Sequence, residues 1–200
     1  MFSGIVTSLD IAKKIEKTNQ GMEITLPIPD GWKLTEGESV NIDGICSTVK
    51  ALDKDNFSVY YMPATLKVTT MAGIRDTHQF NLERSLTLNS LVGGHLVSGH
   101  VDCVGEIVNI KDEGQSRTLT ISLPEEFSKY LIYKGSVAVN GVSLTVVSVE
   151  KDNFVVSLIP YTVSHTNLGS LKAQDKVNIE VDTVAKYLEK LTHEQSSPLG

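Results

Sequence analysis

The feature that most constrains this chain is an internal repeat. When the sequence is aligned with itself at an offset of 97 residues, Ile24–Glu83 matches Ile121–Glu180 without a gap, and 19 of the 60 paired positions are identical. Near the start the offset becomes 95, so that FSGIV at 2–6 aligns with VSGHV at 97–101. The chain is therefore interpreted as a tandem duplication of one folding unit, with an insertion or deletion in the first hairpin of one copy.

Each copy has the pattern of short β-strands. Runs of β-branched and aromatic residues, such as ICSTVKAL and FSVYYM, are separated by turn residues. Asp43-Gly44 and Asn140-Gly141 are hairpin signals at equivalent positions. Pro63 and Pro160 each predict the start of a short helix. Six or so strands in about 95 residues favour a small barrel that closes on itself.

We therefore expect an all-β fold with a short C-terminal α-helix. The predicted domains are a first barrel over 1–92, a second barrel over 93–183, and a helix and tail over 184–200. Val184, Leu188 and Leu191 form an apolar stripe on that helix. The stripe could pack on another subunit or cover its own barrel, and the sequence does not favour either. The final SSPLG is typical of a disordered tail.

Composition restricts the class of function. The formal net charge is −6 and no block of Lys or Arg stands out, so neither nucleic acid nor an anionic membrane is an expected partner. The N-terminus lacks the pattern of a signal peptide, and no apolar run approaches the roughly 20 residues that span a bilayer. The two cysteines, Cys46 and Cys103, show no metal or redox spacing. These features predict a cytoplasmic protein with reduced thiols.

A set of motifs, in order along the chain, resembles the riboflavin synthase family. The set comprises the opening MFSGIV, ESVNIDGICSTV, NLERSL followed by GGHLVSGHVD, YKGSVAVNGVSLTV, LIPYTVSHTNLG and VNIEVD. No single motif is decisive, but together they cover residues 1 to about 191 in the family's order and spacing.

This resemblance implies a fold and a reaction. The fold would be a tandem duplication of a six-stranded Greek-key β-barrel with a C-terminal helix, assembled as a homotrimer. The reaction would be the dismutation of two molecules of 6,7-dimethyl-8-ribityllumazine to riboflavin and 5-amino-6-ribitylaminouracil, with no metal or other cofactor. Each barrel would bind one lumazine, and the active site would form between the first barrel of one subunit and the second barrel of its neighbour. Lumazine synthase is a candidate partner.

The chemistry implied by the resemblance needs proton transfer and a nucleophile. His100 stands where the first copy has Ile5, and it is expected to transfer or position a proton. Asp182 is expected to pair with His100, and Ser39 to offer a hydroxyl. The alternative for His100 is an ordinary surface histidine. His95 is assigned to the junction between the domains, because alternation along a strand would point it away from His100.

Cys46 is expected to supply a nucleophile or a proton through its thiol, and its counterpart in the second copy is Ser143. The alternative is a buried structural cysteine, which is the preferred interpretation of Cys103. Lys134 would neutralise charge on the substrate, although an exposed lysine is the simpler interpretation. The full set of predicted substrate-binding residues is Gly4, Ile5, Val6, Cys46, Ser47, Thr48, Met62, Ala64, Thr65, Gly99, His100, Val101, Lys134, Ser143, Leu144, Thr145, Ile159, Pro160 and Thr162.

Two residues depart from the family pattern. Ser47 stands where a leucine is expected, which predicts a looser first pocket, and Asp43 stands where an asparagine is usual.

Two other functions are alternatives to this one. A lumazine protein would share the fold and hold the ligand as an optical antenna, but it would have lost parts of the second-repeat motifs that this chain keeps. A flavin reductase would need a G-x-G-x-x-G after a strand, and none is present.

Overall fold

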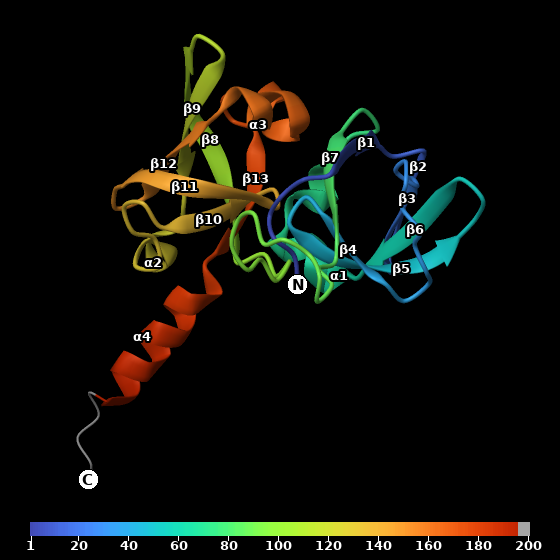
Figure 1. Ribbon diagram of the computed structural model, residues 1–200, viewed down its shortest axis with the longest axis horizontal. Helices are drawn as coiled ribbons and strands as arrows, with labels where there is room; N and C mark the ends of the chain where they lie inside the picture. The colour runs from blue at the N-terminus through green and yellow to red at the C-terminus, as the bar shows by residue number, and fades with distance from the viewer. Residues whose placement is uncertain (196–200) are drawn as a thin grey trace.

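The computed structural model describes residues 1–195, and side-chain environments as far as residue 192, as two β-sheet units with a helix extending from the second (Figure 1). The tail predicted for 196–200 lies outside the described residues. The first unit contains β1 (Ser8–Ile11), β2 (Lys14–Thr18), β3 (Gly21–Pro27), β4 (Ser39–Ile42), β5 (Ile45–Leu52), β6 (Asn56–Tyr61), α1 (Pro63–Val68), η1 (Thr70–Gly73) and β7 (Gln79–Arg84). The second contains β8 (Cys103–Glu113), β9 (Ser116–Ser122), α2 (Glu125–Ser128), β10 (Ser136–Val139), β11 (Val142–Val149), β12 (Asn153–Leu158), α3 (Pro160–His165), η2 (Asn167–Ser170) and β13 (Lys176–Val181), and α4 (Thr183–Gln195) follows.

The second repeat forms the predicted six-stranded closed barrel, in the order β10-β11-β12-β9-β8-β13. Its strands alternate as expected for a barrel with a filled interior: in β11, Val142, Leu144 and Val146 are buried, and the residues between them face outward. A single core fills the interior and includes Phe154, which is fully buried. The all-β duplicated fold is thus confirmed.

The prediction of a closed six-stranded barrel was wrong for the first repeat, which forms an open seven-stranded sheet in the order β1-β7-β4-β5-β6-β3-β2. The two outer strands, β1 and β2, follow each other in the chain and are separated by Ala12 and Lys13. Ile11 pairs with β7 and Lys14 with β3. In the second repeat the transition lies within the continuous β8, where Glu106 pairs with β13 and the next residue, Ile107, pairs with β9. The extra residues at this bend divide one strand into two.

An approximate twofold axis relates the two repeats where they meet. The chain starts of the two copies pair through an isolated antiparallel bridge between Phe2 and Val97, which are equivalent residues and are both fully buried. The turn glycines also meet: a Cβ added to Gly44 would lie 2.9 Å from the amide nitrogen of Gly141. Apart from this bridge, the β-pairing described here joins strands of the same repeat.

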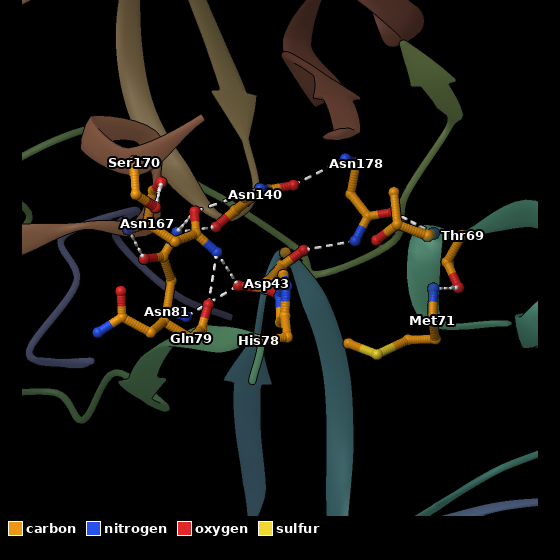
Figure 2. A network of polar contacts seen from close by, with 12 residues as sticks. Asp43, Thr69, Met71, His78, Gln79, Asn81, Asn140, Asn167, Ser170 and Asn178 are labelled. Carbon is orange, nitrogen blue, oxygen red and sulfur yellow. Dashed lines mark hydrogen bonds and ion pairs between the residues drawn. The ribbon is translucent and has the colours of Figure 1, made fainter. Parts of the chain in front are cut away.

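Figure 2 shows the buried polar network that joins the two repeats. The Asp43 carboxylate accepts hydrogen bonds from the Asn81 amide at 2.8 Å and from the Asn167 side chain at 2.9 Å. Its other oxygen lies 2.6 Å from Nε2 of His78. The Asn178 side chain donates to the Asp43 carbonyl at 2.8 Å and accepts from the Thr70 amide at 2.8 Å. Asp43 therefore anchors contacts on both sides of the interface, and an asparagine there could not form an ion pair with His78.

The C-terminal helix α4 confirms the predicted helix, but its apolar stripe does not cover its own barrel. Val184, Leu188 and Leu191 are more than half exposed, and so is Tyr187 beside them. The helix is tied to its barrel by an ion pair between Lys186 and Asp102 at 2.5 Å. No helix within residues 1–195 combines the length and the apolar character needed to cross a bilayer.

The Asp43–His78 pair predicts a pH-dependent stability. Burial lowers the pKa of His78, but the hydrogen bond and charge of Asp43, together with the charge of Asp175, outweigh burial and raise it. A raised folded-state pKa gives stability that is complete below the unfolded value of about 6.5 and is lost as the pH rises through the higher folded value. We therefore expect the free-energy difference between the wild type and His78→Gln to shrink as the pH rises above about 6.5.

Denaturant unfolding at a series of pH values measures this difference. The control is His165→Gln, because the described contacts of His165 are with Ser164 and Tyr161 and include no carboxylate. A constant difference between wild type and His78→Gln over this pH range would contradict a stabilising role for the charged pair.

Candidate active site

A pocket of about 540 Å³ opens on the first repeat and contains nine of the predicted substrate-binding residues. We call it the Cys46 pocket. It is lined by Cys46 and Thr48 of β5, by Met62 and the first turns of α1, and by the segment at 99–101 that opens the second repeat. The predicted residues that line it are Cys46, Ser47, Thr48, Met62, Ala64, Thr65, Gly99, His100 and Val101, and those that were not predicted are Ile45, Tyr60, Tyr61, Val68 and Thr69.

Strand alternation in β5 explains which side chains face this pocket. Ile45, Ser47 and Val49 are buried in the barrel interior, whereas Cys46 is half-buried and Thr48 is exposed on the other face. The thiol of Cys46 and the hydroxyl of Thr48 are thus two positions apart on one face of the strand. Cys46 is a free thiol.

The segment that brings His100 to the pocket is held by one buried carboxylate. Glu180 of β13 accepts hydrogen bonds from the backbone amides of Ser98, Gly99 and His100 at 2.6, 2.9 and 3.1 Å, and from the Ser98 hydroxyl at 2.7 Å. Gly99 has φ +81°, and a Cβ there would lie 2.7 Å from Cβ of Cys46. The Cys46 amide donates to the Gly99 carbonyl at 2.8 Å. The imidazole of His100 is exposed at this pocket.

The same arrangement recurs around Ser143 of the second repeat. Glu83 of β7 accepts from the amides of Ser3 and Gly4 at 2.7 and 3.0 Å and from the Ser3 hydroxyl at 2.6 Å. Burial raises the pKa of Glu83, and these hydrogen bonds oppose the rise. The Ser143 amide donates to the Gly4 carbonyl at 2.8 Å. Each repeat therefore receives the opening segment of the other, and Ile5 occupies the position that corresponds to His100.

The Ser143 site differs from the Cys46 pocket because the end of the linker between the two repeats lies on it. His95 lies on Ser143, with Nδ1 2.7 Å from the hydroxyl, and a Cβ on Gly94 would clash with the same side chain. Burial lowers the pKa of His95, and the charges of Asp182 and Glu180 oppose this. His95 is at the domain junction as predicted, but its contact with a predicted substrate-binding residue was missed. The glycine pair before it was the available signal, because it permits this close approach.

The expected pair between Asp182 and His100 is not formed within this chain as described. Oδ1 of Asp182 instead accepts the amide hydrogen of Val184 at the start of α4. The charge of Asp182 acts on His95, whose pKa it raises against the effect of burial.

Ser47 does not loosen the pocket as expected, because its hydroxyl points into the barrel. It lies 2.7 Å from the hydroxyl of Tyr61 and is 3% exposed. The equivalent pair in the second repeat is Leu144 and Leu158, both buried. The small Ser47 and the large Tyr61 thus fill the space that two leucines fill in the second repeat. The hydrogen bond between their hydroxyls gives each buried hydroxyl a partner.

The other predicted residues take the following positions. Ser39 is half-buried on β4, opposite Thr48 in the strand register, and its carbonyl accepts from the Ser85 hydroxyl at 2.6 Å. Lys134 is exposed with φ 63°, where the first repeat has Gly37, so its backbone adopts a conformation that is strained for a lysine. On the second repeat Thr145, Ile159 and Pro160 are exposed and Thr162 is half-buried, whereas Leu144 faces the core. Val6, from the start of the first repeat, packs against the core of the second.

The Cys46 pocket can therefore hold a small molecule and exchange protons with it. Its volume lies in the range of small-molecule sites, about 300–1,000 Å³. A thiol, three threonine hydroxyls and an imidazole come from different elements and line one cavity. By contrast, burial raises the pKa of Cys103 to about 12, which makes that thiol unreactive and agrees with a structural role.

Comparison with known proteins agrees with this duplicated architecture. A family model described as the lumazine binding domain matches the chain twice, at residues 3–85 and 98–182. The structure of LumP complexed with riboflavin superposes with a TM-score of 0.84 at 25% identity, over 92% of this chain and 100% of that chain. LumP complexed with 6,7-dimethyl-8-(1'-D-ribityl) lumazine gives a TM-score of 0.81 at 24% identity, over 90% and 99% of the two chains, and supports the fold.

Among sequence relatives, the riboflavin synthase of Brucella abortus (strain 2308) is 39% identical over 98% of this chain and 100% of its own length. The enzyme of Bacillus subtilis (strain 168) is 35% identical over 96% of this chain and 90% of its own. That of Schizosaccharomyces pombe is 34% identical over 96% and 93%. With two lumazine-binding repeats and similarity along nearly its whole length, the chain belongs to the riboflavin synthase family.

Proposed function

We propose that this chain is a riboflavin synthase, which transfers a four-carbon unit between two molecules of 6,7-dimethyl-8-ribityllumazine. The products are riboflavin and 5-amino-6-ribitylaminouracil. The observation that carries this proposal is the Cys46 pocket, in which side chains from both repeats converge at positions that match the family motifs. The similarity to riboflavin synthases over nearly the whole chain supports the same reaction.

In this proposal each repeat binds one lumazine, and binding two reactants in a fixed orientation supplies much of the catalysis. Well-oriented reactants reach effective molarities of about 10⁵–10⁸ M. His100 removes or returns a proton at the lumazine methyl groups, and Cys46 supplies the nucleophile or proton at the other ring. Ser39, Thr48 and Thr145 donate hydrogen bonds to the ring edge, and Lys134 balances charge that develops on the substrate.

We further propose that the active unit is a homotrimer in which the Cys46 pocket of one chain faces the Ser143 site of its neighbour. The exposed stripe of α4 supports an interface between subunits, since more than half of each apolar side chain would otherwise contact water. This arrangement would also bring the carboxylate of Asp182 to His100 from a second chain. The proposed domain limits are 1–92, 93–183 and 184–200, the proposed location is the cytoplasm, and lumazine synthase stays a predicted partner.

Incubation of the purified protein with the lumazine tests the reaction directly, because riboflavin is detected by its fluorescence and chromatographic mobility. Production of riboflavin and the uracil in equal amounts is the expected result. Tight binding of the lumazine without turnover would instead favour an optical antenna, which the structural similarity to LumP makes the alternative. Failure to bind the lumazine would contradict both functions.

Replacement of His100 by Ala or of Cys46 by Ser is expected to reduce turnover without unfolding the protein. Loss of a proton-transfer group lowers kcat by about 10²- to 10⁴-fold. The thermal midpoint should stay within a few degrees, as for changes of about 1 kcal/mol, because His100 is exposed and Cys46 is half-buried. Lys54→Gln, in an exposed turn outside the pocket, is the control and should match the wild type. Large melting losses with normal specific activity of the folded fraction would assign both residues to structure.

Deletion of residues 184–200 is expected to lower the apparent mass in solution and to make activity per chain fall on dilution. This deletion removes the apolar stripe of α4, which in this proposal holds the subunits together. A chain shortened only by residues 196–200 is the control for a loss of length. Sedimentation velocity and activity should be measured at the same protein concentrations. A fully active monomer at assay concentration would exclude a site shared between subunits.

A further inference from the structure

A second cavity, of about 670 Å³, lies between the two repeats and contains none of the predicted substrate-binding residues. We call it the inter-repeat cavity. Its lining comes in equivalent pairs from η1, η2 and the turns before β7 and β13. Six residues of the first repeat and their partners 97 positions later all line it, and these pairs are Thr70/Asn167, Gly73/Ser170, Ile74/Leu171, Thr77/Gln174, His78/Asp175 and Gln79/Lys176. The cavity therefore lies on the approximate twofold axis that relates the repeats.

One wall of this cavity is the buried polar network of Figure 2. The Asn167 side chain donates both to Asp43 and to the Gln79 carbonyl, each at 2.9 Å. The Ser170 hydroxyl donates to the Asn167 carbonyl at 3.0 Å. Hydrogen bonds already fix the side chains of this wall, so a ligand would not have to order this part of the cavity.

The charge of the cavity is opposite to that of the whole protein. Lys67, Arg75 and Lys176 line it and Asp175 is the single carboxylate among the lining residues, while the chain carries a formal net charge of −6. None of the three cations forms an ion pair within the described part of the chain. Lys176 lies opposite Glu106 in the β8–β13 register without pairing with it. Three unpaired cations around a concave surface make a local positive potential that attracts anions.

The hydrogen-bonding groups beside these cations are also free. The side chains of Thr77, Gln79 and Gln174 make no hydrogen bond to any other residue in the described structure. They can donate to the oxygens of a bound group once the cations have attracted it. Gln174 is held at φ 74°, a backbone conformation that is uncommon outside glycine.

We propose that the inter-repeat cavity binds a small phosphate-bearing anion, with the phosphate between Lys67, Arg75 and Lys176. A guanidinium and two ammonium groups match the charge and the acceptor geometry of a phosphate. The duplication made the cavity symmetric, and two of its three cations come from divergence, whereas Arg75 aligns with Lys172. Lys176 stands where the first repeat has Gln79, and Lys67 where the second has Ser164. This site is separate from the Cys46 pocket, so the proposal does not depend on the proposed reaction.

The test is a titration of the full chain with inorganic phosphate and, separately, with glycerol phosphate, followed by amide chemical shifts. Saturable shifts should concentrate at Thr77, Gln79 and Gln174. Lys176→Gln, which copies the first repeat, should weaken binding up to about fivefold, and the double change with Arg75→Gln up to about 25-fold. Asp175→Asn removes a repelling carboxylate and should tighten binding by a similar single factor. Tighter binding of glycerol phosphate than of free phosphate would indicate an ester as the ligand, and the reverse would indicate phosphate itself.

Lys54→Gln is the matched control, since it makes the same change in net charge at an exposed position that does not line the cavity. It should bind phosphate like the wild type. Equal weakening in Lys54→Gln and Lys176→Gln would mean that net charge alone drives the binding, and the proposed site would be wrong. Shifts that do not saturate, or that fall outside the cavity, would overturn it as well. Unchanged thermal midpoints of the variants confirm that any loss of binding is not a loss of fold.

Discussion

The arrangement of both candidate sites depends on one repeated interaction, a buried glutamate that binds consecutive backbone amides. Glu83 and Glu180 are 5% and 3% exposed, and each holds the segment that opens its own repeat. Such a charge is tolerated only because several donors replace its water. The two opening segments therefore lie against the opposite repeat, with Gly4 against Ser143 and Gly99 against Cys46. Loss of either glutamate would therefore change a site on the neighbouring repeat.

Much of the fold could be predicted because the repeat, the strand pattern and the turn dipeptides all indicate the same answer. Alternation along β5 also places Cys46 and Thr48 on one face. The division of the first strand could not be predicted, because it depends on a few extra residues near Ala12. The exchange of opening segments was missed for a different reason. Glu83 and Glu180 are identical in the alignment, but a sequence does not show whether an identical carboxylate is paired with solvent or with backbone amides.

The two departures from the family pattern have partners that are distant in sequence. The hydroxyl of Ser47 meets Tyr61, and the carboxylate of Asp43 meets His78, which comes 35 residues later. From the sequence alone, Ser47 was expected to loosen the first pocket and Asp43 to have little effect, because Asp-Gly still forms the turn. In the fold each of the two residues therefore has a hydrogen-bonding partner that replaces its contact with water.

Duplication provides two equivalent sites, and the chain connection makes them different. The linker that joins the first repeat to the second lies against the Ser143 site. Its end places His95 on Ser143, while Cys46 has an open pocket beside it with His100 at its edge. A reaction between two identical molecules needs one to give and one to receive. Two sites that share a fold but differ in access and in their proton-carrying groups can hold the same molecule in two different roles.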